Sequence, residues 1–292
     1  MMMLCAKTVA FIMKKYKNFI DITCSYWIFL VVIVLIAVII SKVLTGAVLL
    51  MIVDSVSDTF KILYLLYSCI IDIFAVLLIN TLFSKQKLSC LGITSRVIEG
   101  YYKGIFCGTL LSVLVIAVTY LCLSGRLEIN KNINIIITVM MLIGFLIQAT
   151  SEEILFRGYI QNVMEKHNGS RFAIVIQAII FALVHLLSVG NYPIAVINLF
   201  LFSILLGWIM VYFKNIFLVS GIHFIWNIFI TLIIDGKISG IVVNDYVTRF
   251  NFKGNSILIG GEFGIEGSLF VTIIFIAMIL IIKIKRGKNV VK

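Results

Sequence analysis

Six polar side chains that could take part in a reaction lie in stretches of this chain that are otherwise apolar. Three of them belong to QATSEEILFRGY, residues 148–159, which is flanked by apolar runs on both sides. Charged side chains in such a setting cost about 2.5–3.5 kcal/mol each on membrane-insertion scales and usually mark a functional interior. The six are Glu152, Glu153, Arg157, His185, His223 and Asn227.

Helical spacing predicts which of these side chains share a face. Glu153 and Arg157 are four residues apart, so they can pair along one face of a helix. Glu152 lies about 100° round the helix from Glu153 and should point elsewhere, where it is available for chemistry.

The two histidines have neighbours at the same helical spacing. In HFIWN, His223 and Asn227 are four apart and present an imidazole and a carboxamide on one stripe. In FALVH, Phe181 lies one turn from His185. A helix that continues past Arg157 would put Glu152 about 20 Å from its cytoplasmic end. We therefore expect these groups to meet inside the membrane, in a pocket open to the cytoplasm.

This set of side chains is suited to hydrolysis by an activated water. An apolar pocket raises the pKa of a carboxylic acid, which makes it a competent general base. Glu152 would deprotonate a water that His185 helps to position, and the water would attack a peptide carbonyl. His223 and the Asn227 amide would donate hydrogen bonds to the developing oxyanion. Arg157 would neutralise Glu153 and hold that face of the helix in register.

The same residues allow two other interpretations. Two histidines and a glutamate are a common catalytic zinc set, so Glu152, His185 and His223 are candidate ligands, whereas Asn227 fits hydrogen bonding better. Polar side chains in a bilayer also bind neighbouring helices together, so His223 and Asn227 could serve only as interhelical contacts. The residues by themselves leave the metal-free and zinc mechanisms both open.

The elements that must position this set are membrane helices. The 292-residue chain is 62% hydrophobic and only 13% charged, well away from the composition of soluble domains. Since a bilayer-spanning helix needs roughly 20 mostly apolar residues, the sequence predicts an all-α polytopic membrane protein with about eight transmembrane helices and an intramembrane polar cavity. We expect one transmembrane domain over residues 1–292, with the motif-bearing core at about 134–285. The predicted spans are 22–41, 62–83, 103–124, 134–156, 172–190, 194–213, 216–235 and 267–285.

The distribution of positive charge orients the chain. With the N-terminus inside, the inner segments hold 17 of the 24 Lys and Arg residues and the outer segments hold 7, with Lys42 counted as outer. This is the asymmetry of the positive-inside rule. It predicts a multi-pass protein of the cell membrane with both termini cytoplasmic. The net charge of +11 then faces anionic lipid, and nucleic acid is not an expected partner.

Three features have no predicted role in the reaction. Asp72 has no partner at helical spacing and is expected to face the interior or an aqueous crevice. The stretch 236–266 is predicted to form a small hairpin or a Gly-rich loop on the outer surface. The six cysteines show no metal-binding or CxxC spacing and are interpreted as packing residues.

EEILFR, FALVH and HFIWN, in this order on successive spans, resemble the three motifs of the CPBP family of intramembrane proteases. That family comprises the CAAX prenyl endopeptidases and their Abi-like relatives in bacteriocin processing or immunity. The resemblance covers roughly residues 145–285. It implies an eight-helix fold with a polar cavity in the membrane. Its members have been described both as metalloproteases and as metal-independent glutamate proteases, so zinc stays open.

The resemblance also implies a role for each motif residue. Glu152 would activate water with His185, and His223 and Asn227 would form the oxyanion site. Glu153 and Arg157 would be the supporting pair.

Taken together, these features predict an intramembrane endopeptidase that hydrolyses a peptide bond of a membrane-associated peptide or protein. One alternative is a non-enzymatic bacteriocin-immunity or scaffold protein that keeps the polar residues to hold helices together. The other is a carrier that uses Glu152 and Asp72 as a proton path; carriers often show inverted repeats, and none is evident in this sequence.

Overall fold

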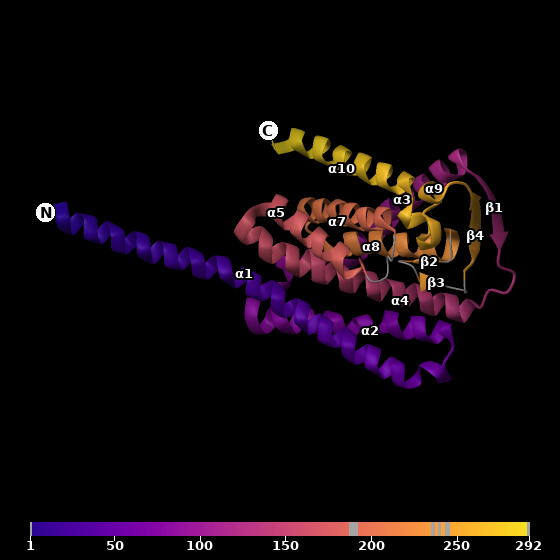
Figure 1. The fold of residues 1–292 in the computed structure, drawn as a ribbon, viewed down its shortest axis with the longest axis horizontal. Coiled ribbons are helices and arrows are strands. Elements are labelled where there is room, and N and C mark those ends of the chain that lie inside the picture. Colours follow the sequence, from indigo (N-terminus) through magenta and orange to yellow (C-terminus); the bar gives the residue numbers. More distant parts are fainter. Residues whose placement is uncertain (1, 187–191, 235–236, 239–240, 243–245, 291–292) are drawn as a thin grey trace.

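The computed structural model shows a bundle of long helices with four short strands at one end (Figure 1). It describes residues 2–186, 192–234, 237–238, 241–242 and 246–290. The main helices are α1 (Met2–Ile52), α2 (Asp58–Ile79), α3 (Val97–Cys122), α4 (Ile135–Glu153), α5 (Gln161–Val184), α7 (Pro193–Phe213), α8 (Ile216–Ile228) and α10 (Leu269–Val290). A short helix α9 (Ser256–Ile259) precedes α10.

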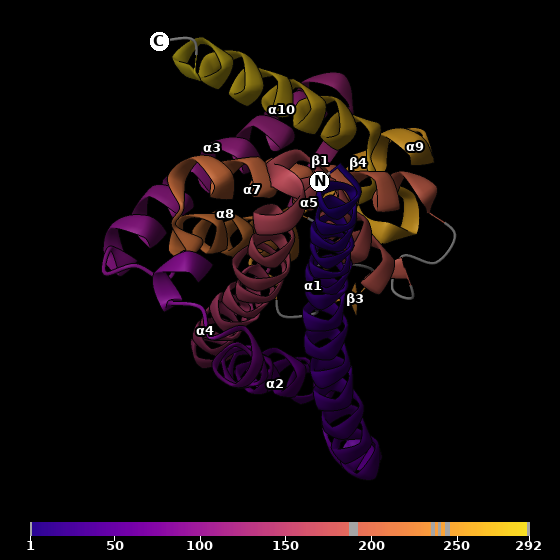
Figure 2. The same ribbon diagram turned by 90° about the vertical axis from the view of Figure 1, so that its left-hand side faces the viewer.

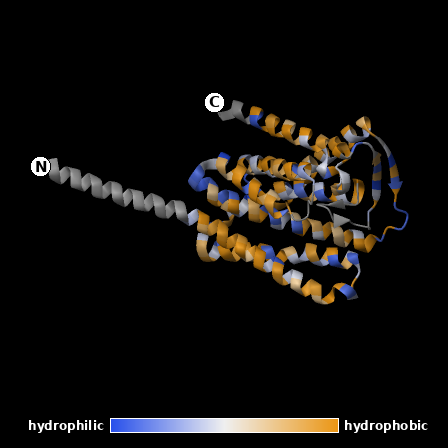
Figure 3. Cartoon of the chain, in the orientation of Figure 1, coloured by the Kyte–Doolittle hydropathy of each residue, from blue (hydrophilic) through white to orange (hydrophobic). Residues whose placement is uncertain are grey.

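The predicted fold class is confirmed. Among the described residues, six helices are long and apolar enough to cross a membrane. They are Tyr26–Ser55, Asp58–Ser84, Val97–Cys122, Ile135–Val184, Pro193–Phe213 and Ile216–Ile234. Their outward faces are largely apolar (Figure 3), as a lipid-facing surface requires. The fourth of them, 50 residues long, includes most of two predicted spans, 134–156 and 172–190. Residues 187–190 of the second span lie outside the described part.

The eighth predicted span falls on α10, which is not among these six. Helix α10 lies on the opposite side of the bundle from α1 and α2 (Figures 1 and 2). The count of eight membrane crossings therefore stays a prediction.

One glycine inside α5 turns the chain back. Helix α4 passes into a π-helical segment, Ile154–Ile160, and the helix then continues to Gly169. Gly169 has φ 78° and ψ 161°, a conformation that favours glycine, and a side chain there would project into open space. The expected continuation of this helix beyond Arg157 is confirmed, and the reversal at Gly169 brings His185 back towards Glu152.

The strands correct the prediction for residues 236–266. The two-residue strands β2 (Lys237–Ile238) and β3 (Ile241–Val242) pair antiparallel, as expected for a hairpin. However, β4 (Thr248–Lys253) pairs antiparallel with β1 (Ser124–Ile129), which had not been assigned as a strand. Tyr246 and Asn251 also donate hydrogen bonds to Glu128, and these bonds lower the pKa of that carboxyl group. The segment is therefore tied to the connection between α3 and α4.

The sequence analysis misplaced Lys42, whereas Asp72 is buried in the interior as expected. Helix α1 runs on to Ile52, so Lys42 lies within the first candidate span and not in an outer segment. Its Nζ atom is 2.6 Å from Asp72 Oδ2, and Ser41 Oγ donates to Asp72 Oδ1 at 2.7 Å. Asp72 therefore has two partners, both on a different helix, where helical spacing within α2 could not reveal them.

The cysteines are not all packing residues. Cys69 is buried on α2, but Cys107 and Cys122 on α3 are exposed on the outside of the bundle. All four of the cysteines whose side chains are described are free. The packing interpretation is therefore wrong for Cys107 and Cys122, whose positions on the helix face outward.

Glycines allow α3 to lie against α8, the helix that carries His223. A methyl group on Gly104 would lie 2.2 Å from the Leu218 carbonyl oxygen and 2.9 Å from Gly221 Cα. Both are backbone atoms, which cannot rotate away. Close backbone approach of this kind, through small residues four apart such as Gly100 and Gly104, is a usual way for helices to associate in a membrane.

We expect Gly104→Ala to destabilise the protein and to reduce its activity together. The added methyl group must separate α3 from α8, and overpacking of this kind typically costs about 1–3 kcal/mol. Thermal unfolding in detergent is the measurement. Gly46→Ala is the matched control, because nothing lies within 4 Å of its added carbon and alanine favours a helix more than glycine does. Equal melting temperatures for Gly104→Ala and the wild-type protein would contradict the close packing.

Candidate active site

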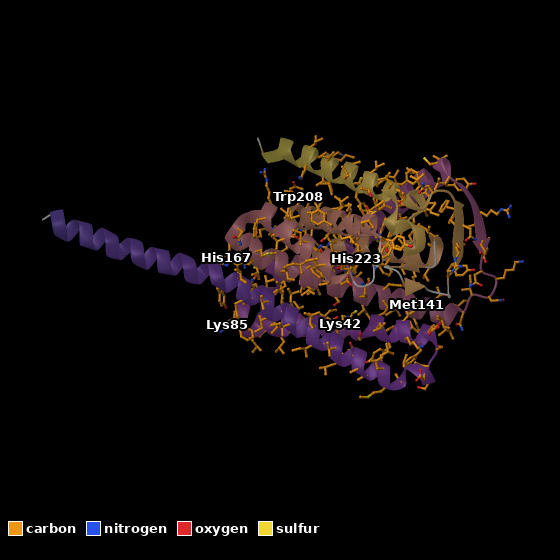
Figure 4. All side chains as sticks on the ribbon, in the orientation of Figure 1. Lys42, Lys85, Met141, His167, Trp208 and His223 are labelled. Atoms are coloured by element: carbon orange, nitrogen blue, oxygen red, sulfur yellow. The ribbon has the colours of Figure 1, made fainter. Side chains whose placement is uncertain are left out.

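A cavity of about 260 Å³ lies in the interior of the bundle. Its walls are mostly apolar, with a few polar groups among them. They are formed by Lys42, Ile62, Leu65, Leu66, Cys69, Phe145, Gln148, Glu152, Phe181, His185, Leu199, Phe202, His223, Trp226, Asn227 and Glu266. Figure 4 shows two of these residues on different helices, Lys42 on α1 and His223 on α8.

The cavity extends towards the end of the bundle that carries the strands. Its lining includes Ile62 near the start of α2, Leu199 near the start of α7, and Glu266 in the connection before α10. No described lining residue belongs to the 157–171 connection at the other end. The opening of the cavity to the cytoplasm stays a prediction.

The two neighbouring glutamates point in different directions, as their spacing predicts. Glu153 is fully buried, and Arg157 Nη1 donates to its Oε1 at 2.6 Å, with both side chains completely inaccessible. Glu152 lines the cavity and its side chain keeps 22% of its surface accessible. Only Glu152 is thus in a position to contact a substrate.

His223 lies between the two acids. Its Nδ1 is 2.8 Å from Glu153 Oε1, and its Nε2 is 3.8 Å from Glu152 Oε2. Because an ionised carboxylate only accepts hydrogen bonds, Nδ1 carries the hydrogen in that contact. The neutral ring then presents a lone pair at Nε2. The sequence analysis did not foresee the contact with Glu153, since it joins α4 to α8.

His185 presents its Nε2 atom to the same oxygen of Glu152. Nδ1 of His185 lies 2.8 Å from the carbonyl oxygen of Phe181, one turn earlier, and a carbonyl only accepts. Nε2 faces Glu152 Oε2 at 4.0 Å. The Phe181 ring also packs on the His185 ring, with centroids 4.5 Å apart, and the Arg157 guanidinium lies 4.8 Å from its centre. Phe181 therefore links the first motif to the second.

Asn227 reaches the site through Gln148, a residue that the sequence analysis left without a role. Asn227 Nδ2 donates to Gln148 Oε1 at 2.8 Å, and Gln148 Nε2 donates to Glu152 Oε1 at 2.5 Å. A sequence signal was available, because Gln148 precedes Glu152 by four residues and so shares its helical face. The link to Asn227 spans two helices and had no such signal.

A third acid, Glu266, was also missed. It is buried in the connection before α10, lines the cavity, and accepts a hydrogen bond from Trp226 Nε1 at 2.9 Å. The Asn198 side chain donates to the carbonyl oxygens of Glu266 and Ser268, and so holds the backbone at Glu266 and just after it. Its position depends on contacts with α7 and α8, so no local pattern could have indicated it.

The candidate zinc ligands are too far apart to surround an ion as they stand. Zinc bonds of about 2.0–2.2 Å in a tetrahedral site put neighbouring ligand atoms roughly 3.4 Å apart. Here Glu152 Oε2 lies 4.0 Å from His185 Nε2 and 3.8 Å from His223 Nε2. Among the described residues, no group of three or more His, Cys, Asp or Glu has the arrangement of a metal site. The donor types would suit zinc, but their spacing does not fit it.

All six predicted residues therefore lie near one another, and four of them line the cavity: Glu152, His185, His223 and Asn227. Residues 134–229, which contain all six, match the family model described as "Type II CAAX prenyl endopeptidase Rce1-like". The likeness to the Rce1-like family is thus confined to this segment. The match covers about a third of the chain, from the start of α4 to the end of α8. No curated protein matches the chain.

The match confirms the resemblance seen in the motifs and supports a peptidase embedded in the membrane, with a peptide as substrate. The Rce1-like segment does not build the whole cavity. Lys42 and four residues of α2 close one side, and Glu266 contributes from beyond the segment at the other end of the chain. The parts of the chain outside the match therefore shape the space in which a substrate would lie.

Proposed function

We propose that this protein is an intramembrane endopeptidase that hydrolyses a peptide bond by means of a water activated by Glu152. The observation that carries the proposal is the convergence of two imidazole Nε2 atoms on one oxygen of Glu152, at 3.8 and 4.0 Å, inside a largely apolar cavity. That oxygen, Oε2, is buried and accepts no hydrogen bond from the described residues.

A single water can bridge Glu152 Oε2 and one of these imidazole Nε2 atoms. If the water oxygen lies about 2.8 Å from Glu152 Oε2 and from an imidazole Nε2, the angle between these two directions is roughly 90°. The two hydrogens of the water can then form both hydrogen bonds. The water then donates one hydrogen to Glu152 and the other to His185. A lone pair of the water remains for attack on a peptide carbonyl carbon, and Glu152 takes the proton.

The negative charge that develops on the carbonyl oxygen must be stabilised by hydrogen-bond donors. Asn227 has one Nδ2 hydrogen beyond the one it gives to Gln148. His223 donates from Nε2 only when both of its ring nitrogens are protonated, and the carboxylate of Glu153 at Nδ1 stabilises that form. The supporting pair therefore contributes to the chemistry through His223 as well as to the fold.

The proposal is tested by incubating the purified protein in detergent or liposomes with a set of membrane-anchored peptides. Mass spectrometry identifies any fragments. Cleavage by wild-type protein that is absent from the variant Glu152→Gln supports a peptidase. Full activity in the presence of a strong chelator supports the metal-free use of Glu152, and loss that is restored by zinc supports the zinc mechanism. Intact peptides throughout would favour a scaffold or immunity protein.

We further propose that the 157–171 connection and both termini face the cytoplasm, on the basis of the lysine and arginine distribution. A cysteine introduced as Asn168→Cys on a cysteine-free background should react with an impermeant thiol reagent only after the membrane is opened. Lys131→Cys, before α4 and at the other end of the bundle, is the matched control and should react in intact cells. The reverse pattern would mean that the orientation is inverted.

A further inference from the structure

Gln148 joins two residues of the site that lie on different helices. It accepts from Asn227 Nδ2 through Oε1 and donates to Glu152 Oε1 through Nε2, at 2.8 and 2.5 Å. The amide nitrogen of Asn227 can only donate and a carboxylate can only accept, so the two contacts determine which way round the Gln148 amide lies. The direction of this chain of hydrogen bonds, from Asn227 to Glu152, is thereby set.

The chain of hydrogen bonds makes the two oxygens of Glu152 different. Oε1 is occupied by Gln148, whereas Oε2 is buried without a hydrogen-bond partner among the described residues and faces the Nε2 atoms of His185 and His223. We infer that Gln148 is a positioning residue, which makes Oε2 of Glu152 the base and sets the plane of the Asn227 carboxamide. The inference rests on the proposed peptidase function.

Both halves of the proposed reaction depend on this one side chain. With Oε1 held, rotation of the Glu152 carboxyl group is restricted, and Oε2 stays directed at the position of the water. With Oε1 of Gln148 bonded to Asn227, the second hydrogen of Asn227 has one direction instead of several. Gln148 thus places the base and an oxyanion donor relative to one another across the cavity.

A purely structural role makes different predictions. Hydrogen bonds between helices often serve only to hold membrane helices together, and Gln148 does join α4 to α8. In that case its replacement would lower thermal stability and would not separate kcat from KM. A positioning residue instead changes kcat with little effect on KM, because it orients the base and an oxyanion donor for the transition state.

The hydrogen bonds are tested without any substrate. The chain has four glutamines, so a sample labelled with ¹⁵N only at glutamine gives few side-chain amide signals, and loss of one pair in Gln148→Leu assigns Gln148. We expect Glu152→Gln and Asn227→Ala each to shift the Gln148 signals. The signals of Gln177, which is buried and bonds to the Ile174 and Ser203 carbonyl oxygens away from the cavity, should not move. If the Gln148 signals are unchanged in both variants, the inference is overturned.

The role is tested with a membrane-anchored peptide that wild-type protein cleaves. Gln148→Leu should reduce kcat by about tenfold to a hundredfold at nearly unchanged KM, as loss of a supporting hydrogen bond typically does. Gln148→Glu keeps the acceptor for Asn227 but offers Glu152 a donor only when the introduced acid is protonated. Its activity should therefore recover as the pH falls, whereas Gln148→Leu should show no such recovery.

The outcomes separate this inference from the proposed function. Normal kcat in both variants would overturn the positioning role. A wild-type protein that cleaves no peptide, while the Gln148 signals respond as expected, would count against the peptidase and support the hydrogen-bond chain. Should Gln148→Leu fail to fold, the responses to Glu152→Gln and the pH profile of Gln148→Glu still decide the matter.

Discussion

Replacing Glu152 by glutamine is expected to reduce peptide cleavage by about 100- to 10,000-fold, the usual contribution of a general base. Glutamine has the same shape, and its carbonyl oxygen can still accept the hydrogen bond from Gln148 that Glu152 Oε1 accepts. Its amide group would then occupy the place of Oε2 and face the two imidazole Nε2 atoms as a donor. The side chain stays in position but cannot take a proton from water.

The measurement is turnover of a cleaved peptide beside thermal stability in detergent for the same samples. Melting temperatures of Glu152→Gln and the wild-type protein should lie close together. Glu165→Gln is the matched control: Glu165 is another acid on the same continuous helix, but it bonds to Lys214 outside the cavity, so cleavage should stay near normal. Near-normal cleavage by Glu152→Gln would mean that the base must be sought elsewhere.

Replacing Arg157 by alanine should act on folding and activity together. Arg157 and Glu153 have no accessible side-chain surface, so removal of the arginine leaves a buried carboxylate whose remaining contact is His223 Nδ1. Breaking a buried pair in this way typically costs about 3–5 kcal/mol. The loss also removes the guanidinium from beneath Phe181, which packs on His185. The cost shrinks if Glu153 takes up a proton.

The double variant Glu153→Gln with Arg157→Gln should recover part of this stability. A glutamine at position 153 still accepts a hydrogen bond from His223 but leaves no uncompensated charge in the interior. The wild-type pair is also incompletely satisfied, since Glu153 Oε2 and Arg157 Nε and Nη2 are buried without hydrogen-bond partners in the described part of the chain. Activity should not recover to the same extent, because the uncharged amide no longer stabilises a protonated His223.

Thermal and denaturant unfolding of Glu153→Gln, Arg157→Gln, the double variant and the wild-type protein form the cycle that isolates this interaction. Lys214→Ala is the control for an exposed pair. Its Nζ is 3.2 Å from Glu165 Oε1 at the surface, and exposed pairs contribute about 0–1 kcal/mol. If Arg157→Ala is no more destabilising than Lys214→Ala, the buried pair does not hold this part of the fold.

The sequence by itself holds the signal for features that depend on neighbours along one helix, although the contact of Gln148 with Glu152 was overlooked. Long apolar runs predict helices in a bilayer because lipid offers no partner for an exposed peptide group. The Glu153–Arg157 pair and the Phe181–His185 contact are both one turn apart, and helix geometry alone brings such residues together. The order of the three motifs likewise sufficed to indicate the family that the comparison then confirmed.

Only the tertiary structure decided which groups on different helices meet. Lys42 with Asp72, Asn227 with Gln148, and Glu266 with Trp226 come together because of how helices cross and how far they continue. The pairing of β1 with β4 joins segments more than a hundred residues apart in the same way. Local periodicity specifies the direction of a side chain from its own helix axis, but not the rotation, tilt and depth of the next helix. Those are set by packing such as that of Gly104 on Gly221, which lets α3 support α8 and so places His223 between Glu152 and Glu153.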